Sequence, residues 1–322
     1  AYSPRRFPRL GGLMPLLRCP ADKGHLLTVS GTRGGKTSSI AVPNCLSWDG
    51  PMVVHDPKGE LAALCRKAQK SKDRPIIQLK PSENLDRDGI NVLDWLNPDS
   101  PQVVEDVKAV AGAFNKGEEP RGQNAYFINQ ALNLIQCFIL EVICSPDVPA
   151  SMKTLSTVRS MISSEEIIEI LRHIMDKGPA YAFGAPHQYA SDLYTLARDS
   201  GKVWADVKSQ ASEMTAWLSI PTLAALVCEQ ENKTASIKEI VQGDADLFIS
   251  VPVKTLSSTP QISRVIFSTL LTAYYEFNTN PLHRTLFLID EMPRLGYMAE
   301  LETARDVGAG YGIVLWVIVQ DM

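Results

Sequence analysis

Short apolar runs alternate with a helical pattern in the first 80 residues, and this alternation constrains the fold more than any other feature of the chain. Residues 26–29, 52–55 and 76–79 are short, mostly apolar runs, and residues 61–70 have the character of a helix. Strands that are joined by helices run parallel, and helices then cover both faces of their sheet. The sequence therefore predicts an α/β domain built on a parallel sheet.

The alternation stops after about residue 84, and no strand is predicted from there to about residue 238. Apolar residues in 125–143 recur at the spacing of one helix face. Ser163 and Glu166 have the spacing of a capping box, which predicts a helix that begins there and runs to about residue 176. Residues 203–218 carry a further helical stripe. This middle part is typical of an all-α domain.

Strand patterns return near the end of the chain, at residues 247–251, 285–289 and 313–319, with a helix predicted over 263–277. We therefore expect one α/β domain that is split in the sequence. Its parts are residues 1–84 and 238–322, and the inserted all-α domain occupies residues 85–237.

Residues 1–22 form a predicted basic arm at the start of the split domain. The first 20 residues contain four arginines among four prolines, a composition that indicates irregular structure. The arm is either a solvated tail or a contact with a neighbouring subunit, with DNA or with a membrane surface.

Composition limits the classes of protein that the chain can belong to. Of its 322 residues, 45% are hydrophobic and 21% are charged, as in a globular protein with a substantial core. The net charge of −4 and the pI of about 5.8 do not indicate nucleic-acid binding, so any DNA contact must come from local patches or an assembled ring. Six scattered cysteines without a Cys-x-x-Cys pair disfavour a zinc site and a disulfide framework.

The sequence offers no membrane span, because the longest uninterrupted apolar run, residues 313–319, is far shorter than the roughly 20 residues that cross a bilayer. It shows no signal peptide either. The chain begins at Ala1 and ends at Met322, just after a predicted strand. We therefore expect a fragment of a longer protein.

A glycine-rich turn lies between the first strand and the helix predicted after it, and it is the first candidate site. Such a turn points successive backbone N–H groups at phosphate oxygens, and the helix adds its positive N-terminal end. Lys36 would reach the β- and γ-phosphates of ATP, and the hydroxyl of Thr37 would bind Mg²⁺. Ser30 stands where the usual pattern has its first glycine. The predicted ATP-contacting residues are Ser30, Gly31, Thr32, Arg33, Gly34, Gly35, Lys36, Thr37 and Ser38.

The second candidate site is the acid pair Asp290 and Glu291, at the end of the predicted strand 285–289. Two adjacent carboxylates after a buried strand are costly unless a cation compensates them. Asp290 would hold Mg²⁺, directly or through water. Glu291 would orient and deprotonate an attacking water.

Three further features complete the predicted site. Gln320 follows the last strand and is expected to sense the γ-phosphate, and it stands with Lys36 and Glu291 as a candidate catalytic residue. The charged turn 56–60 is expected at the carboxyl edge of the sheet, where ligands of parallel sheets bind. An arginine could act on the ATP of a neighbouring subunit, and the sequence does not choose among the candidates Arg33, Arg294 and Arg305.

Taken together, four blocks resemble the coupling-protein ATPases of conjugation and type IV secretion, the TraG-like branch of hexameric DNA pumps. The blocks are Thr32-Arg33-Gly34-Gly35-Lys36-Thr37; Val42-Pro43-Asn44 through Asp56-Pro57-Lys58-Gly59-Glu60; Ile289-Asp290-Glu291-Met292-Pro293-Arg294-Leu295-Gly296; and Gly310-Tyr311-Gly312 with the strand up to Gln320.

The resemblance implies a RecA-like P-loop nucleotide-binding domain with an inserted all-α domain. It also implies an ATPase with ATP and Mg²⁺ as cofactors, a homo-hexamer when full length, and anchoring to the bacterial inner membrane, on its cytoplasmic face, through an N-terminal segment that precedes residue 1. The implied partners are single- or double-stranded DNA bound without sequence preference, relaxase or effector proteins, and components of the secretion channel.

Two other readings stay open at this point. The helical middle could act mainly as a docking receptor for secretion substrates, without turnover of its own. The chain could also be a DNA translocase of the chromosome-segregation or repair type, which shares the glycine-rich loop and the acidic strand. The turn 56–60 favours the coupling-protein reading over the second of these.

Overall fold

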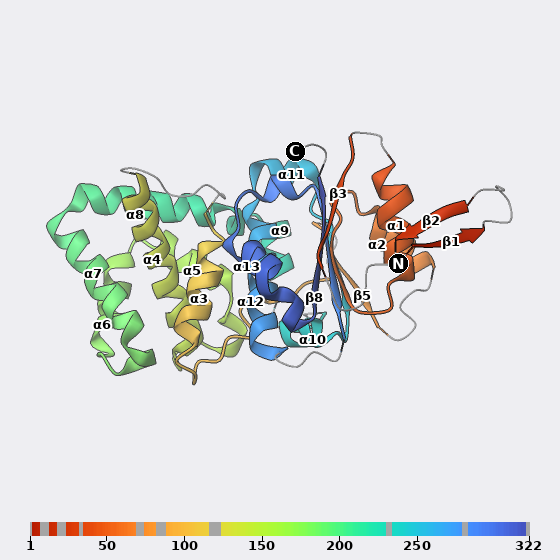
Figure 1. Cartoon of the computed structure of the whole chain (residues 1–322). Coiled ribbons are helices and arrows are strands. Elements are labelled where there is room, and N and C mark those ends of the chain that lie inside the picture. Colours follow the sequence, from red (N-terminus) through yellow and green to blue (C-terminus); the bar gives the residue numbers. More distant parts are fainter. Residues whose placement is uncertain are drawn as a thin grey trace.

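The computed structural model of the chain describes residues 2–6, 13–17, 24–31, 35–68, 74–81, 88–115, 124–229, 234–278 and 283–319. Side chains are described throughout these ranges except in the first two and at Lys36. The chain forms a parallel sheet with helices on both faces and a large helical insertion to one side (Figure 1). This is the predicted α/β architecture.

Six parallel strands form the main sheet, in the order β3-β8-β7-β4-β6-β5. The apolar residues of the strands are buried wherever helices cover the sheet. This burial explains why short apolar runs in the sequence predicted the strands well. The strands are β3 (Leu26–Val29), β4 (Met52–His55), β5 (Ile76–Leu79), β6 (Asp246–Ile249), β7 (Thr285–Asp290) and β8 (Ile313–Val319).

Alternate residues of each strand enter two different cores, as the pleat of a strand requires. Val54, Phe248 and Leu288 pack beneath a first group of helices, whereas Val53 and Phe287 pack on the opposite face. The first group is η1 (Lys36–Ala41), α1 (Val42–Ser47) and α2 (Glu60–Lys67). The opposite face carries α10 (Ile237–Gln242), α12 (Gln261–Phe277) and α13 (Ala299–Val307), and α11 (Val253–Ser258) packs on α12 near the edge of the sheet.

Most of the helical insertion lies beyond α12 and α13, on the side away from α1 and α2, whereas its last helix contacts α12 (Figure 1). Its long helix α4 packs against α3, α5, α7 and α8. The insertion contains α3 (Val103–Gly112), α4 (Asn124–Cys144), η2 (Ala150–Met152), α5 (Leu155–Ser163), α6 (Ile167–Asp176), η3 (Tyr181–Gly184), α7 (Ala185–Asp199), α8 (Gly201–Thr215), η4 (Ala216–Ser219) and α9 (Pro221–Val227). The domain boundaries at residues 84/85 and 237/238 stay a prediction.

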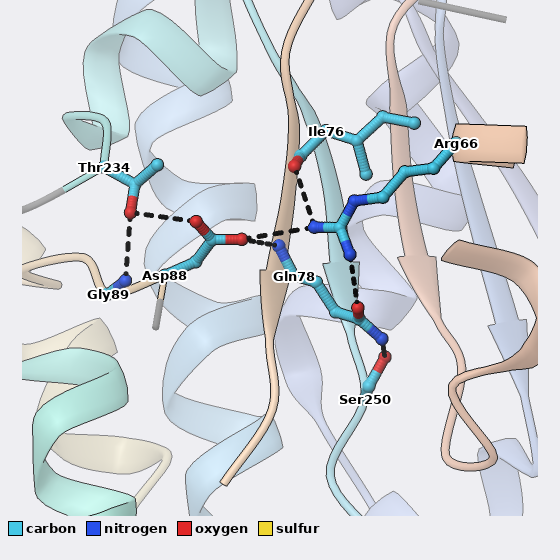
Figure 2. A network of polar contacts seen from close by, with 7 residues as sticks. All are labelled: Arg66, Ile76, Gln78, Asp88, Gly89, Thr234 and Ser250. Atoms are coloured by element: carbon cyan, nitrogen blue, oxygen red, sulfur yellow. Dashed lines mark hydrogen bonds and ion pairs between the residues drawn. The ribbon is translucent and has the colours of Figure 1, made fainter. Parts of the chain in front are cut away.

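The chain enters and leaves the insertion side by side, next to β5, and polar contacts join the two connections (Figure 2). Asp88 Oδ2 accepts a hydrogen bond from the Gln78 backbone N–H at 2.6 Å and lies 3.4 Å from Arg66 Nη2. On its other side, Asp88 Oδ1 accepts from the Thr234 hydroxyl at 3.3 Å. A Cβ at Gly89 would lie 2.8 Å from the Ala225 carbonyl oxygen of α9, so the entering connection requires glycine where it passes that helix.

Two local predictions are wrong. The first 20 residues are not irregular throughout, because β1 (Tyr2–Arg6) and β2 (Leu13–Leu17) pair as an antiparallel hairpin. Ser163 does not begin a helix. It is the last residue of α5, and its hydroxyl donates to the Arg159 carbonyl.

Helix α4 is long and apolar enough to cross a membrane, with a mean hydropathy of 1.6 over its best window. No other helix in the described residues meets that test. Most of the window, 61%, is buried inside the molecule, and the core helix of a globular protein passes the same test. The helix is therefore weak evidence for a membrane span.

Candidate functional site

The glycine-rich turn lies between the end of β3 and the start of η1. The Ser30 N–H continues the sheet by donating to the Val319 carbonyl at 3.1 Å, and the described chain resumes at Gly35. Gly35 has a φ of 74°, in the left-handed region that residues with a Cβ adopt rarely. Its carbonyl accepts the Ser39 N–H at 2.7 Å, which starts the helical turn that carries Lys36 and Thr37.

The acid pair lies at the same edge of the sheet as the glycine-rich turn. Val29 of β3 is opposite Val319 of β8, and Ile318, one residue earlier, is opposite Asp290 of β7. Only β8 separates the two strands, so they lie about 10 Å apart at the usual spacing of neighbouring strands. The fold thereby brings together two sequence features that are more than 250 residues apart.

His55 fixes the backbone at the acid pair, a role that the sequence did not indicate. This fully buried side chain at the end of β4 has its Nδ1 at 2.7 Å from the Asp290 carbonyl oxygen. Because a carbonyl can only accept, Nδ1 carries the proton and donates. Burial lowers the pKa of His55 to about 4, so the ring is neutral at pH 7. The ring also contacts Phe267 edge to face at 5.8 Å.

Glu291 adopts a strained backbone conformation directly after the acidic strand. Its φ of 61° and ψ of 38° are left-handed values that cost a residue with a side chain about 1 kcal/mol or more. The Glu291 N–H donates to Asp290 Oδ1 at 3.1 Å, and its Oε2 lies 3.8 Å from Arg294 Nε. The turn therefore projects the second carboxylate away from the line of the strand.

The turn 56–60 lies at the predicted edge but serves first as a helix cap. Asp56 is buried, and its Oδ2 accepts the N–H groups of Leu61 at 2.8 Å and Ala62 at 3.2 Å, at the start of α2. Burial raises the pKa of the Asp56 carboxyl, and the backbone donors oppose that shift. The specific turn sequence thus fixes α2 beneath the sheet.

The candidate arginines differ in their surroundings. Arg294 Nη1 donates to the Ser257 hydroxyl at 3.1 Å, so this side chain is engaged within its own chain. Arg305 is exposed and pairs with its neighbour Asp306, with Nε at 2.8 Å from Oδ1. Neither arrangement tests a role at a neighbouring subunit. Four predicted site residues, Thr32, Arg33, Gly34 and Gln320, lie outside the described residues, as does the side chain of Lys36.

The described part of the site fits a nucleotide with Mg²⁺. The left-handed backbone at Gly35, the hydroxyl of the half-buried Thr37 and the largely buried carboxylate of Asp290, 7% exposed, share one sheet edge. Oxygen ligands of this kind suit Mg²⁺, which usually takes one or two protein ligands and fills its remaining positions with phosphate and water. No group of three or more His, Cys, Asp or Glu that could hold a metal occurs among the described residues.

The fold and the glycine-rich turn define a RecA-like α/β protein of the P-loop type. The structure resembles that of the plasmid coupling protein TrwB in complex with ADP and Mg²⁺, with a TM-score of 0.67 over 93% of this chain and 64% of that chain at 14% identity. A second TrwB structure, in complex with the ATP analogue ADPNP, also matches with a TM-score of 0.67, at 15% identity over 92% of this chain and 63% of that chain.

A family model described as "Type IV secretory system Conjugative DNA transfer" matches residues 9–322, so the chain belongs to this family. It is 34% identical over 320 residues to the type IV secretion system-coupling protein VirD4 of Bartonella quintana (strain Toulouse), covering 97% of this chain and 48% of that protein. It is 33% identical to the conjugal transfer protein TraG of Agrobacterium fabrum, covering 97% of this chain and 47% of that protein.

These matches confirm the resemblance to the TraG-like coupling proteins. The chain spans about half the length of the curated relatives it matches.

Proposed function

We propose that this chain is the nucleotide-binding part of a coupling protein, which binds ATP with Mg²⁺ and uses its hydrolysis to move DNA or protein substrates toward a secretion channel. The observation that carries the proposal is the shared sheet edge of the glycine-rich turn and the acid pair, one strand apart. A phosphate cradle and a carboxylate at that separation can hold the two ends of a triphosphate–metal unit.

Each residue of the site has a distinct role in this proposal. The backbone of residues 30–38 and the ammonium of Lys36 bind the phosphates. Thr37 and Asp290 would hold Mg²⁺, which supplies positive charge against the phosphates when bound. Glu291 orients the attacking water and accepts its proton, and Gln320 contacts the γ-phosphate. The strained backbone of Glu291 supports an active role, because left-handed non-glycine residues cluster at functional sites.

The first test separates binding from turnover. Lys36→Ala should weaken binding of an ATP analogue at least about tenfold, because it removes the cation that faces the phosphates. Glu291→Gln should bind the analogue normally and lose at least about 100-fold in turnover, because it lacks a base for the water. Binding is measured on this chain by fluorescence titration, and turnover on the intact protein by phosphate release with and without DNA.

Lys202→Ala is the matched control, because Lys202 is exposed at the start of α8, in the insertion and away from the sheet edge. It should change neither quantity. Equal binding by wild type and Lys36→Ala, or no nucleotide binding by either, would refute the proposal.

The partners follow at a coarser level from the family, whose description is conjugative DNA transfer. We propose that assembled subunits contact DNA mainly through its phosphates, without sequence preference and more weakly at high salt. Because the chain has a net charge of −4, this contact would come from local patches or from an assembled ring. Relaxase or effector proteins, the secretion channel, the hexameric ring and the inner membrane remain proposed partners of the intact protein.

A docking role for the insertion is compatible with turnover at the sheet edge. The insertion does not stand apart from the rest of the molecule, because its buried residues form one continuous hydrophobic core with those of α12 and one face of the sheet. Tests of substrate docking should therefore use the whole chain.

A further inference from the structure

Arg264 is a buried cation that contacts two segments, the end of α3 in the insertion and the loop after the acid pair. It lies in the first turn of α12 with only 4% of its surface exposed. Its Nε donates to the Ala113 carbonyl at 3.3 Å, and Nη1 donates to the carbonyls of Leu295 at 2.5 Å and Tyr297 at 2.8 Å. One rigid guanidinium therefore holds the end of α3 and a loop that follows the acid pair.

The two segments are far apart in the sequence and belong to different parts of the fold. Ala113 is the C-cap of α3 in the insertion, at the end of the helix where carbonyls have no partner inside it. Leu295 and Tyr297 lie four and six residues after the strained Glu291. A change in the backbone at Glu291 can therefore move the carbonyls that Arg264 binds, because only a few residues separate them.

One turn further along α12, Ser268 repeats the arrangement. Its Oγ lies 3.1 Å from the Ala109 carbonyl oxygen of α3 and 2.9 Å from Glu300 Oε1 of α13. Two successive turns of α12 thus contact α3 on one side and the segment 295–300 on the other. This repetition indicates that α12 is the physical link between the insertion and the chain beyond the acid pair.

A buried arginine is an unfavourable choice for a contact that never changes, because burying its charge costs free energy. All three hydrogen bonds that Arg264 makes with described residues go to backbone carbonyls, and no carboxylate among them neutralises it by direct contact. Burial lowers the pKa of Arg264, and the nearby charge of Glu300 opposes that shift. Buried cations are costly to desolvate, and an apolar side chain could fill the space at lower cost.

We propose that Arg264 is a positioning residue that couples the loop after the acidic strand to the end of α3. Through this coupling, nucleotide binding at the sheet edge changes the structure at the end of α3 in the helical insertion. The proposal rests on the proposed function, because it requires nucleotide binding at the sheet edge. The bidentate contact is what performs the coupling. A lysine has one ammonium and cannot donate from two separated nitrogens to carbonyls on opposite sides.

The experiment uses hydrogen exchange on the intact protein with and without ADPNP and Mg²⁺, following peptides that cover residues 107–115 and 291–298. In wild type, nucleotide should slow exchange in both. In Arg264→Lys and Arg264→Met, nucleotide should still slow exchange in 291–298, while the response of 107–115 is lost. Turnover should fall about tenfold with KM changed less than about twofold, because the residue acts after substrate has bound.

Arg159→Met is the matched control. Arg159 is also an arginine with a depressed pKa, caused by burial, but its hydrogen bonds go to Ser212, Thr215 and Ser219, all within the insertion. It should leave both responses unchanged. Arg264→Lys keeps the charge and the aliphatic stem, so it gives an answer even where Arg264→Met fails to fold.

The outcomes separate this inference from the proposed function. A wild type that does not bind ADPNP overturns the proposed function and the coupling together. A wild type that binds ADPNP but shows no response in 107–115 overturns the coupling alone. The same holds where Arg264→Lys responds like wild type, or where Arg159→Met loses the response equally.

Discussion

Two histidines make the same type of contact in different surroundings. His55 Nδ1 lies 2.7 Å from the Asp290 carbonyl oxygen at the candidate site, and His187 Nδ1 lies 3.0 Å from the Met175 carbonyl oxygen in the insertion. Since a carbonyl only accepts, each ring donates from Nδ1. The first contact ties β4 to the end of β7, whereas the second joins neighbouring helices of one helical unit.

His55→Leu should lower the free energy of unfolding by about 1–3 kcal/mol, because the buried Asp290 carbonyl loses its donor. Faster hydrogen exchange in residues 286–296 should accompany it. His55→Asn can place an N–H near the position of Nδ1 and should keep most of the local protection. Chemical denaturation and peptide-level exchange measure the two effects. Exchange in 286–296 that is unchanged in His55→Leu, or equally fast in the control His187→Leu, would show that His55 does not hold the acid pair.

At the scale of elements, the sequence predicted the strands better than the helix ends. Residues 26–29, 52–55 and 76–79 are strands with the predicted bounds. The central strand 52–55 is buried at every position, whereas Leu27 and Val29 of the edge strand 26–29 are exposed. The ends of helices depend on which nearby side chain caps the free backbone groups, and the spacing of apolar residues does not show this. The Ser-x-x-Glu pattern fails at Ser163 but forms a true capping box at Ser236 and Glu239.

The N-terminal hairpin was missed for a related reason. Prolines argue against a strand interior, but a two-stranded hairpin has free edges on both sides and tolerates them. Pro4 lies opposite Pro15 in the register of β1 and β2. The pairing of the two strands, which composition does not encode, decides the structure of this segment.

The interface between α3 and α12 contains a repulsion that depends on pH. Burial raises the pKa of Asp106 to about 6, with added contributions from the negative charges of Glu276 and Glu105. A carboxyl whose pKa is raised in the folded state favours folding most while it is protonated in both states. That stability is present below the unfolded pKa of about 4, declines as pH rises, and is lost through about pH 6.

Asp106→Asn should therefore stabilise the chain by about 1–2 kcal/mol above pH 6, after allowance for solvent screening of the carboxyl, and by nearly nothing below pH 4. Denaturant unfolding at a series of pH values measures the difference from wild type. The control is Asp192→Asn at an exposed position of α7, which should give no such pH dependence. A pH-independent difference for Asp106→Asn would contradict the assigned repulsion.

At the scale of the whole molecule, the sequence predicts candidate site residues but gives no sign of the side chains that support them. The sequence predicted the turn 56–60 at the carboxyl edge of the sheet, and the fold brings the glycine-rich turn and the acid pair to that edge as well. The contacts of His55 and Arg264 go to backbone carbonyls, which every residue carries, so no sequence pattern marks their acceptors. Such supports become visible only when distant segments are seen together.

The insertion and the sheet should unfold together. The insertion and one face of the sheet share a single core that runs from Val53 and Phe287 through α12 to α4. The insertion and the sheet bury apolar surface against the same core. Neither of them should therefore unfold without exposing apolar surface of the other to water. We expect the 322-residue chain to unfold in one transition, although chains of this length often unfold in steps.

Far-UV circular dichroism reports mainly the insertion, which holds most of the helices, and exchange in β4 and β7 reports the sheet. Their denaturant midpoints should coincide. Residues 85–237 expressed alone should bind a hydrophobic dye strongly, because the surface that packs on α12 is then exposed to water. The opposite result, two separated midpoints with a fragment that unfolds cooperatively and binds no dye, would mean that the insertion folds as an independent unit despite the continuous core. In that case the contacts of Arg264 would join two separately stable bodies rather than one.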